Sequence, residues 1–437
     1  MVGVEVGIAS VVVILVLIYA GIHVAVALGL VSFVGVWVYR DSFEVAISLL
    51  AAATHDTIAH AVFANVPLFA LMGIIASEIG LGADVYRVAD QIFRRVRGGL
   101  GMATVAANAL FASITGSSIA AASVFTRIAV PEMRAFGYTR QFSVGGVAGS
   151  SVLGMLIPPS AMLIIYAIVA EQSVGEMFIA GFIPGILLAV AYVLGIVAMC
   201  RLSPDFVGAA TRPAGGARPM MGTLEIVRLL APVAILVVLV LGGIYSGWFS
   251  PEEAGAAGSA GALLVGIVKR RLTWRGLWRV LVETGHITAA ILFLIIAASM
   301  YSRMLGVAAL PTLFSEWLTD LQLGMAGLMV VYVVLMILLG TIIETASIIL
   351  IVVPLFLNAV EALGGNFVWF GIVTVIGAEI GLLTPPLGIS CFTIKSTIQD
   401  PSITLSHIFS GAFPFAVIML LVLILIIVFP QLSLALL

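Results

Sequence analysis

The sequence predicts an all-α polytopic membrane protein built from two inverted repeats, each with a re-entrant hairpin and an unwound helix. Composition supplies the first observation: of 437 residues, 62% are hydrophobic and 9% are charged, whereas a soluble domain carries about 25% charged residues. The second is a double-proline motif that occurs twice, each time inside a long apolar run. The third is the placement of Lys and Arg, which differs around the two copies.

The double-proline motif predicts two interrupted helices. Proline inside a helix removes a hydrogen bond and clashes with the preceding turn, so two in succession should break the helix. In hydrocarbon such a break persists only where protein buries it or where it lines a wet cavity. Broken segments at matching positions of two halves are typical of the binding site of a membrane transporter. The two copies are LGMLIPP (153–159) and IGLLTPP (380–386), in which Pro385 follows Pro158 by 227 residues.

A spanning helix needs about 20 apolar residues, and several stretches of the chain meet this need. We read residues 4–20 as the first spanning helix and not as a removable signal, because no basic region or small-residue cleavage site accompanies them. The predicted spans are 4–20, 22–39, 58–80, 178–200, 226–247, 254–268, 281–299 and 410–430.

Two blocks of the chain, 99–170 and 323–396, have a more complex pattern. Each contains two apolar arms around a polar tip and then a double proline. The arms and tips are 99–114 and 118–130 around 114–118, and 325–343 and 347–360 around 343–347. We predict re-entrant hairpins over about 99–130 and about 325–360; the alternative is an ordinary helix pair with a tight turn. A broken helix should follow each hairpin, over 141–170 and 366–396.

The matches between the blocks imply a domain organisation. The run LGMA occurs at 100–103 and again at 323–326, in the same order relative to the double prolines. We therefore predict one membrane domain over 1–437, with inverted repeats at 60–200 and 285–430. Residues 201–225, rich in Pro, Gly and Arg, should form a cytoplasmic linker between the repeats.

Basic residues predict the orientation of the two hairpins, because Lys and Arg concentrate on the cytoplasmic side. Arg97 and Arg134 flank the first hairpin, which should enter the membrane from the cytoplasm. No Lys or Arg occurs from 304 to 394, so the second hairpin should enter from outside. Similar halves with opposite topology form an inverted repeat, the plan of many secondary transporters.

The sequence carries no recognisable enzymatic motif. Without a Gly-Lys dipeptide no Walker A loop can be written, and neither His-Glu-x-x-His nor Cys-x-x-Cys occurs. An intramembrane enzyme would need a paired nucleophile and base, and the only carboxylates with a suitable place, Glu344 and Glu379, have no evident partner. We predict that the chain is not an enzyme and has no catalytic residue.

The polar tips and the breaks are the candidate binding elements. Unpaired carbonyls and half-helix C-termini coordinate Na⁺, whereas half-helix N-termini attract anions. Each tip should face the break of its own half, giving two cation sites with an anionic substrate between them. The alternative is that the hydroxyl groups only satisfy their own helices. The candidates are Thr115, Gly116, Ser117, Ser118, Pro158, Pro159, Thr345, Ser347, Pro385 and Pro386.

Three charged residues leave alternatives open. An ionisable group at membrane depth is costly and indicates function by default. Glu344 at the second tip and Glu379, six residues before Pro385, could each bind a cation, carry a proton or be paired structurally. Arg127 could attract an anion or anchor its helix at the inner surface.

Several motifs together resemble the large membrane subunit of TRAP (tripartite ATP-independent periplasmic) transporters. The resemblance covers essentially the whole chain. The motifs are ITGSSIAAAS (114–123), PEMRAFGY (131–138), GMLIPPS (154–160), FIPGIL (182–187) and GLLTPPLG (381–388).

This resemblance implies an elevator-type secondary transporter, a multi-pass permease of the bacterial inner membrane. It implies Na⁺-coupled import of organic anions such as carboxylates or sialic acids, with Na⁺ as coupling ion and no other cofactor. The implied partners are a periplasmic substrate-binding protein, a small four-helix membrane subunit and the lipid bilayer, but no nucleic acid. Carried over to this sequence, Thr384 joins the binding residues as part of the second unwound segment. With Glu344 of the second tip included among the candidates, we expect Na⁺ near Ser117, Ser118, Thr345 and Thr384. The alternative is a stand-alone divalent-anion/Na⁺ symporter that needs no binding protein.

The chain departs from the family pattern in three places. Thr126 and Arg127 stand where the first hairpin often has a Gly, and Asn358 stands where a Pro often follows the second hairpin. An Asn that is common before the second double proline is replaced around Gly377 and Ala378. These departures bear on substrate identity and on one of the cation sites.

Overall fold

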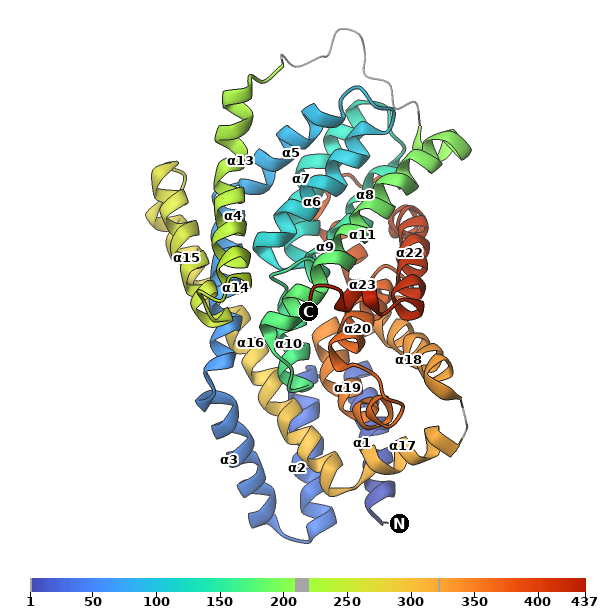
Figure 1. Cartoon of the computed structure of the whole chain (residues 1–437). Coiled ribbons are helices and arrows are strands. Elements are labelled where there is room, and N and C mark those ends of the chain that lie inside the picture. The colour runs from blue at the N-terminus through green and yellow to red at the C-terminus, as the bar shows by residue number, and fades with distance from the viewer. Residues whose placement is uncertain (1, 209–219, 321–322) are drawn as a thin grey trace.

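The computed structural model describes residues 2–208, 220–320 and 323–437, and these residues form helices joined by short connections (Figure 1). The helices before the first double proline are α1 (Val2–Tyr19), α2 (Val24–Arg40), α3 (Phe43–Ala59), the 3₁₀ turn η1 (Ala61–Ala64), α4 (Asn65–Glu78), α5 (Leu81–Phe93), α6 (Gly99–Thr115), α7 (Ser118–Ala135), α8 (Arg140–Ser151) and α9 (Leu153–Leu156). Those that follow it, up to the second half, are α10 (Ala161–Val169), α11 (Val174–Leu202), α12 (Pro204–Val207), α13 (Thr223–Val237), the π-turn η2 (Val238–Gly242), α14 (Gly243–Tyr245) and α15 (Pro251–Val268).

The second half begins with the 34-residue helix α16 (Trp274–Val307). It continues with α17 (Leu310–Asp320), α18 (Gly324–Gly340), α19 (Thr345–Ala362), α20 (Phe367–Leu382), α21 (Ile389–Thr397), α22 (Leu405–Val428) and α23 (Gln431–Leu434). Of the linker predicted over 201–225, residues 209–219 lie outside the described part of the chain.

Length and composition make this an all-helical membrane protein. Within the described residues, six helices are long and apolar enough to cross a membrane, and a seventh span results if α8–α9 and α10, bent by 44° at the first double proline, count as one. The six are Ala61–Glu78, Val174–Leu202, Thr223–Tyr245, Trp274–Val307, Thr345–Ala362 and Leu405–Val428. The predicted membrane class is therefore confirmed.

The apolar helix α3 is missing from the predicted spans, as are the shorter helices α5 and α17. No helix is predicted over 43–59, yet α3 occupies this range. Glu44 and Asp56 interrupt its apolar pattern, which is why hydropathy alone overlooks it. Ser42 caps the helix by accepting a hydrogen bond from the Val45 N–H at 3.3 Å, and Asp56 pairs with Arg303 of α16.

The two halves of the chain repeat one order of elements. Residues 65–202 and 274–428 each contain a helix pair closed by a short tip, then a helix interrupted at a double proline, then a long apolar helix. In Figure 1 the α6–α7 pair lies in the upper half of the molecule and the α18–α19 pair in the lower half, with α9, α10 and α20 between them.

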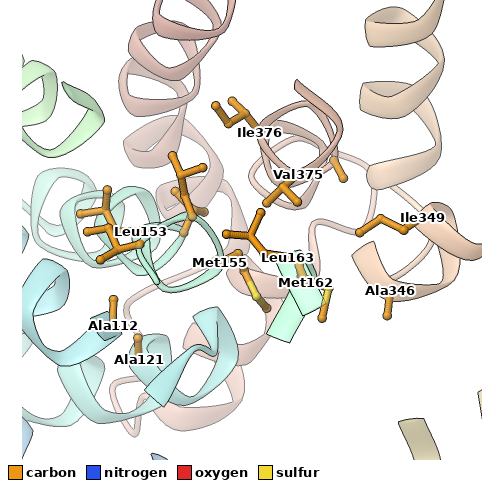
Figure 2. Close-up of a cluster of buried hydrophobic side chains, with 14 of the residues drawn as sticks. Ala112, Ala121, Leu153, Met155, Met162, Leu163, Ala346, Ile349, Val375 and Ile376 are labelled. Atoms are coloured by element: carbon orange, nitrogen blue, oxygen red, sulfur yellow. The ribbon is translucent and has the colours of Figure 1, made fainter. Parts of the chain in front are cut away.

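The halves interleave at the centre of the molecule. Helix α10 packs against α19 and α20, α7 packs against α21, and α8 packs against α22. The Tyr166 hydroxyl of α10 donates a hydrogen bond to the Phe367 carbonyl at 2.7 Å. Figure 2 shows Met155 and Leu163 of the first half beside Val375 of α20. The core is thus shared, so neither half buries its apolar faces alone.

A second set of contacts surrounds α4 and α16. Helix α16 packs against α2, α3 and α4, and α15 packs against α4. An ion-pair cluster fixes α5 to the connection between α15 and α16: the buried Asp84 carboxylate accepts from Lys269 at 2.8 Å and from Arg271 at 2.7 Å. This cluster ties the approach to the first hairpin to the α4–α15–α16 group.

The α8–α22 contact generates a prediction. A β-carbon added at Gly145 would overlap the backbone of Gly411, and backbone cannot move aside as a side-chain end can. We expect Gly145→Ala to destabilise the protein by about 1–3 kcal/mol, seen as a lower Tm of the protein purified in detergent. Gly285→Ala is the control, because beyond its own helix backbone and chain neighbours no described residue lies within 4 Å of the added carbon. Equal Tm values for the two variants would contradict this packing.

Candidate ion-binding site

The first hairpin tip lies against the first double-proline break. Gly116 ends α6 with φ +55°, a left-handed conformation that suits glycine. A β-carbon here would lie 2.6 Å from the Pro159 carbonyl oxygen. The Ala161 N–H, just after the break, donates to the Gly116 carbonyl at 3.4 Å. The tip therefore satisfies a backbone donor that the broken helix exposes.

The hydroxyl groups of this tip differ in their partners. Thr115 Oγ1 donates to the Phe111 carbonyl at 3.1 Å, and Ser117 Oγ caps α7 by accepting from the Ala120 N–H at 3.3 Å. Both satisfy their own helices. Ser118 is fully buried, and its Oγ has no hydrogen-bond partner among the described residues. A free buried oxygen at a tip is what a bound Na⁺ would use.

The second hairpin tip makes the related contact. The Thr341 carbonyl, one residue beyond α18, accepts from the N–H groups of Leu387 and Gly388 at 3.1 and 3.2 Å. Thr384 Oγ1 donates to the Ile380 carbonyl at 2.8 Å and so serves its own helix. Ser347 is buried in the first turn of α19. Both tips thus contact the break of their own half through main-chain groups.

The two breaks differ in exposure. Pro158 and Pro159 are buried, whereas Pro385 and Pro386 are exposed. The first break is enclosed by the shared core, and the second opens at the surface of the described chain. The two halves therefore have the same contact between tip and break, but the first break is buried and the second is exposed.

Glu344 and Glu379, for which the sequence allows the same roles, differ in burial and in hydrogen bonding. Glu379 is 0% exposed, and its Oε1 accepts from Thr345 Oγ1 at 2.9 Å. Its Oε2 has no hydrogen-bond partner among the described residues. Glu344, at the N-cap of α19, is exposed, and its side chain makes no capping bond. Glu379, but not Glu344, is thus held inside the protein beside the second tip.

Arg127 is not brought to the first tip. It lies nine residues after Ser118 on the same helix, or about 14 Å along the axis at 1.5 Å per residue. Its side chain is exposed. This position favours an anchoring role over contact with an anion at the tip.

Two glycines that sequence reasoning missed shape the first tip. A β-carbon at Gly73 of α4 would lie 2.8 Å from Thr115 Cα, and one at Gly154 would lie 3.0 Å from the Ser117 carbonyl. Gly154 precedes the double proline in a repeated motif, a signal that could have indicated it. Gly73 has no such signal, since only the fold brings α4 against the tip.

Two interrupted helices beside polar tips in a helical membrane protein are typical of transporters. Residues 11–432 match the family described as "Tripartite ATP-independent periplasmic transporter, DctM component". This chain belongs to that family, and the resemblance seen in its motifs is confirmed. It is accordingly a TRAP-type large permease component, not an enzyme, and a multi-pass protein of the bacterial inner membrane.

Named relatives carry different solutes. The chain is 33% identical over 392 residues to a C4-dicarboxylate TRAP transporter large permease protein, DctM, of Pseudomonas aeruginosa, covering 89% of this chain and 88% of the relative. It is 31% identical over 374 residues to the sialic acid TRAP transporter large permease protein SiaM of Vibrio cholerae, covering 85% of each. The relatives therefore do not fix one substrate.

The fold is similar to that of a solved transporter. The crystal structure of the Alcanivorax borkumensis YdaH transporter matches with a TM-score of 0.62 and 16% sequence identity, covering 90% of this chain and 89% of that one. At this identity the likeness concerns the fold alone.

The contact between Gly116 and Pro159 can be tested with a matched pair of variants. Gly116 and Gly324 both have a positive φ, +55° and +59°, so alanine is strained at either. At Gly116 the added carbon meets the Pro159 carbonyl, whereas at Gly324 no described residue beyond its own chain neighbours and nearby helix backbone lies within 4 Å. We expect Gly116→Ala to lower the Tm further than Gly324→Ala, by about 1–3 kcal/mol in stability. Indistinguishable melting curves would contradict the tip–break contact.

Proposed function

We propose that this chain is the large permease subunit of a tripartite, Na⁺-coupled importer for a small organic anion, a carboxylate or a sialic-acid-like compound. The observation that carries the proposal is the pairing of each polar tip with the helix break of its own half. Half-helix ends that meet at such a place offer carbonyls to a cation and N–H groups to an anion. The named solutes of the relatives, C4-dicarboxylates and sialic acid, support an anionic substrate.

The proposed Na⁺ positions are near Ser117 and Ser118 in the first half and near Thr345 and Thr384 in the second. Na⁺ is a hard cation that prefers oxygen ligands, which hydroxyl and carbonyl groups supply. The unpartnered Ser118 Oγ and Glu379 Oε2 fit this donor set. Substrate would bind between the tips, with Na⁺ as the coupling ion and no further cofactor.

We further propose that the halves form an inverted repeat with two re-entrant hairpins. The opposite placement of α6–α7 and α18–α19 in Figure 1 supports this topology. In an elevator motion, the hairpins and broken helices would move together against α4 and α16. Gly73 of α4 and Thr115 of the first hairpin would then lie at the interface between the moving and the fixed helices. A glycine there allows the two backbones to approach closely.

The proposed partners are a small four-helix membrane subunit, a periplasmic substrate-binding protein and the lipid bilayer. The description "tripartite" of the family supports two further protein components. Exposed apolar side chains of α1–α3 support contact with lipid or with a membrane subunit: Val12, Val16, Trp37, Val38, Phe43 and Ile47.

Uptake by a reconstituted system tests this function. The chain would be placed in proteoliposomes with its small subunit, and binding protein loaded with radiolabelled anion would be added outside. We expect uptake only with an inward Na⁺ gradient and with the binding protein present. Uptake of free anion at the same rate without the binding protein would favour a stand-alone divalent-anion/Na⁺ symporter.

The tip hydroxyls give a further expectation. Ser118→Ala and Thr345→Val each remove an oxygen from a proposed cation site, and a hydrogen-bond partner of a charged group is worth about 1.5–3 kcal/mol. We expect each variant to lower Na⁺-driven uptake about tenfold without loss of membrane insertion. Ser396→Ala is the control, since this exposed hydroxyl bonds to the Thr393 carbonyl of its own helix and to no other group among the described residues. Wild-type uptake by both tip variants would exclude these positions as ion ligands.

A further inference from the structure

The two tips differ in charge although their backbones correspond. With the 227-residue offset of the double prolines, Ser118 corresponds to Thr345, and these are the first residues of α7 and α19. The same offset aligns Val152 with Glu379, and both are 0% exposed. A fully buried carboxylate in the second half thus replaces an isopropyl group in the first.

No positive side chain compensates Glu379. Its only hydrogen bond in the described part of the chain is the one from Thr345, and it has no ion pair there. The titratable groups that interact with it electrostatically are Glu344 and Tyr192. Neither carries a positive charge, and His23 interacts with Glu344.

Two helix ends lie beside Glu379 and act in opposite directions on its charge. Helix α18 ends at Gly340, where a β-carbon would lie 2.6 Å from the Ala378 carbonyl, so this terminus abuts the turn that holds Glu379. The α18 C-terminus carries a partial negative charge, whereas Thr345, which donates to Glu379, begins α19, whose N-terminus carries a partial positive charge. A buried carboxylate without a charged partner side chain is costly. Its free Oε2 therefore calls for a bound cation or a bound proton.

We propose that Glu379 is a direct ligand of the cation at the second tip, joining the hairpin to the broken helix, with its free Oε2 facing the ion and Thr345 completing the contact. This inference rests on the proposed function and extends it, because the second cation site then includes a carboxylate and the first does not. The second site carries a formal negative charge and binds Na⁺ without substrate. The first site, built from neutral oxygens, depends more on the anion beside it.

The test uses the full chain purified in detergent without substrate. Its Tm is measured while NaCl replaces choline chloride at constant ionic strength. Wild type should melt at a higher temperature as Na⁺ rises, because an ion that binds only the folded state stabilises it. Glu379→Gln should melt at least as high as wild type in choline, since it removes a buried carboxyl group that no positive side chain pairs with. It should also need about tenfold more Na⁺ for the same shift, or show none.

Two further variants keep the result interpretable. Glu361→Gln changes an exposed carboxylate at the end of α19 and should retain the wild-type Na⁺ response. Glu379→Asp keeps the charge and should retain part of the response, even if the glutamine variant folds poorly. A Na⁺ response of Glu379→Gln within twofold of wild type would overturn the proposal.

The outcomes also separate this inference from the proposed function. If wild type imports anion on a Na⁺ gradient while Glu379→Gln responds to Na⁺ like wild type, only the ligand role of Glu379 fails. If wild type shows neither a Na⁺-specific Tm shift nor Na⁺-driven uptake, Na⁺ coupling itself fails, and the ligand role fails with it.

Discussion

The need to satisfy backbone polar groups freed by two double prolines governs this structure. A membrane interior offers no water to these groups, so the protein must supply their partners. It does so with hairpin tips: the Gly116 carbonyl accepts from Ala161, and the Thr341 carbonyl accepts from Leu387 and Gly388. Each tip is thereby held at its break, and the remaining packing of α7 on α21 and α10 on α19 follows from this central arrangement.

The same constraint brings polar groups together at the two double-proline interruptions. Helix ends, main-chain carbonyls and buried hydroxyls meet at both interruptions, where the helices cannot satisfy their own backbone groups. The two places are related in backbone but not in environment. The first is enclosed and neutral, with Ser118 as its free oxygen, and the second has exposed prolines and the buried Glu379 carboxylate.

Sequence reasoning reached the membrane class, the family and the location of the breaks, because proline chemistry and hydropathy are local properties. It missed α3, since Glu44 and Asp56 disturb the apolar pattern, and the compensating Arg303 lies far away in the chain. It also missed Gly73, because nothing in the neighbouring residues reveals that α4 meets the tip. For Glu344 and Glu379 the local sequence supports every role equally.

What the sequence determined by itself is the interruption of two apolar segments and the polar character of the two tips, since these depend on residue type and spacing. Only the tertiary structure decided which groups meet across those interruptions. Thr115 and Ser117 turn out to serve their own helices, whereas Ser118 and Glu379 keep an unpartnered oxygen in the described structure. The physical reason is that burial and hydrogen bonding depend on residues that are distant in the chain and adjacent only after folding.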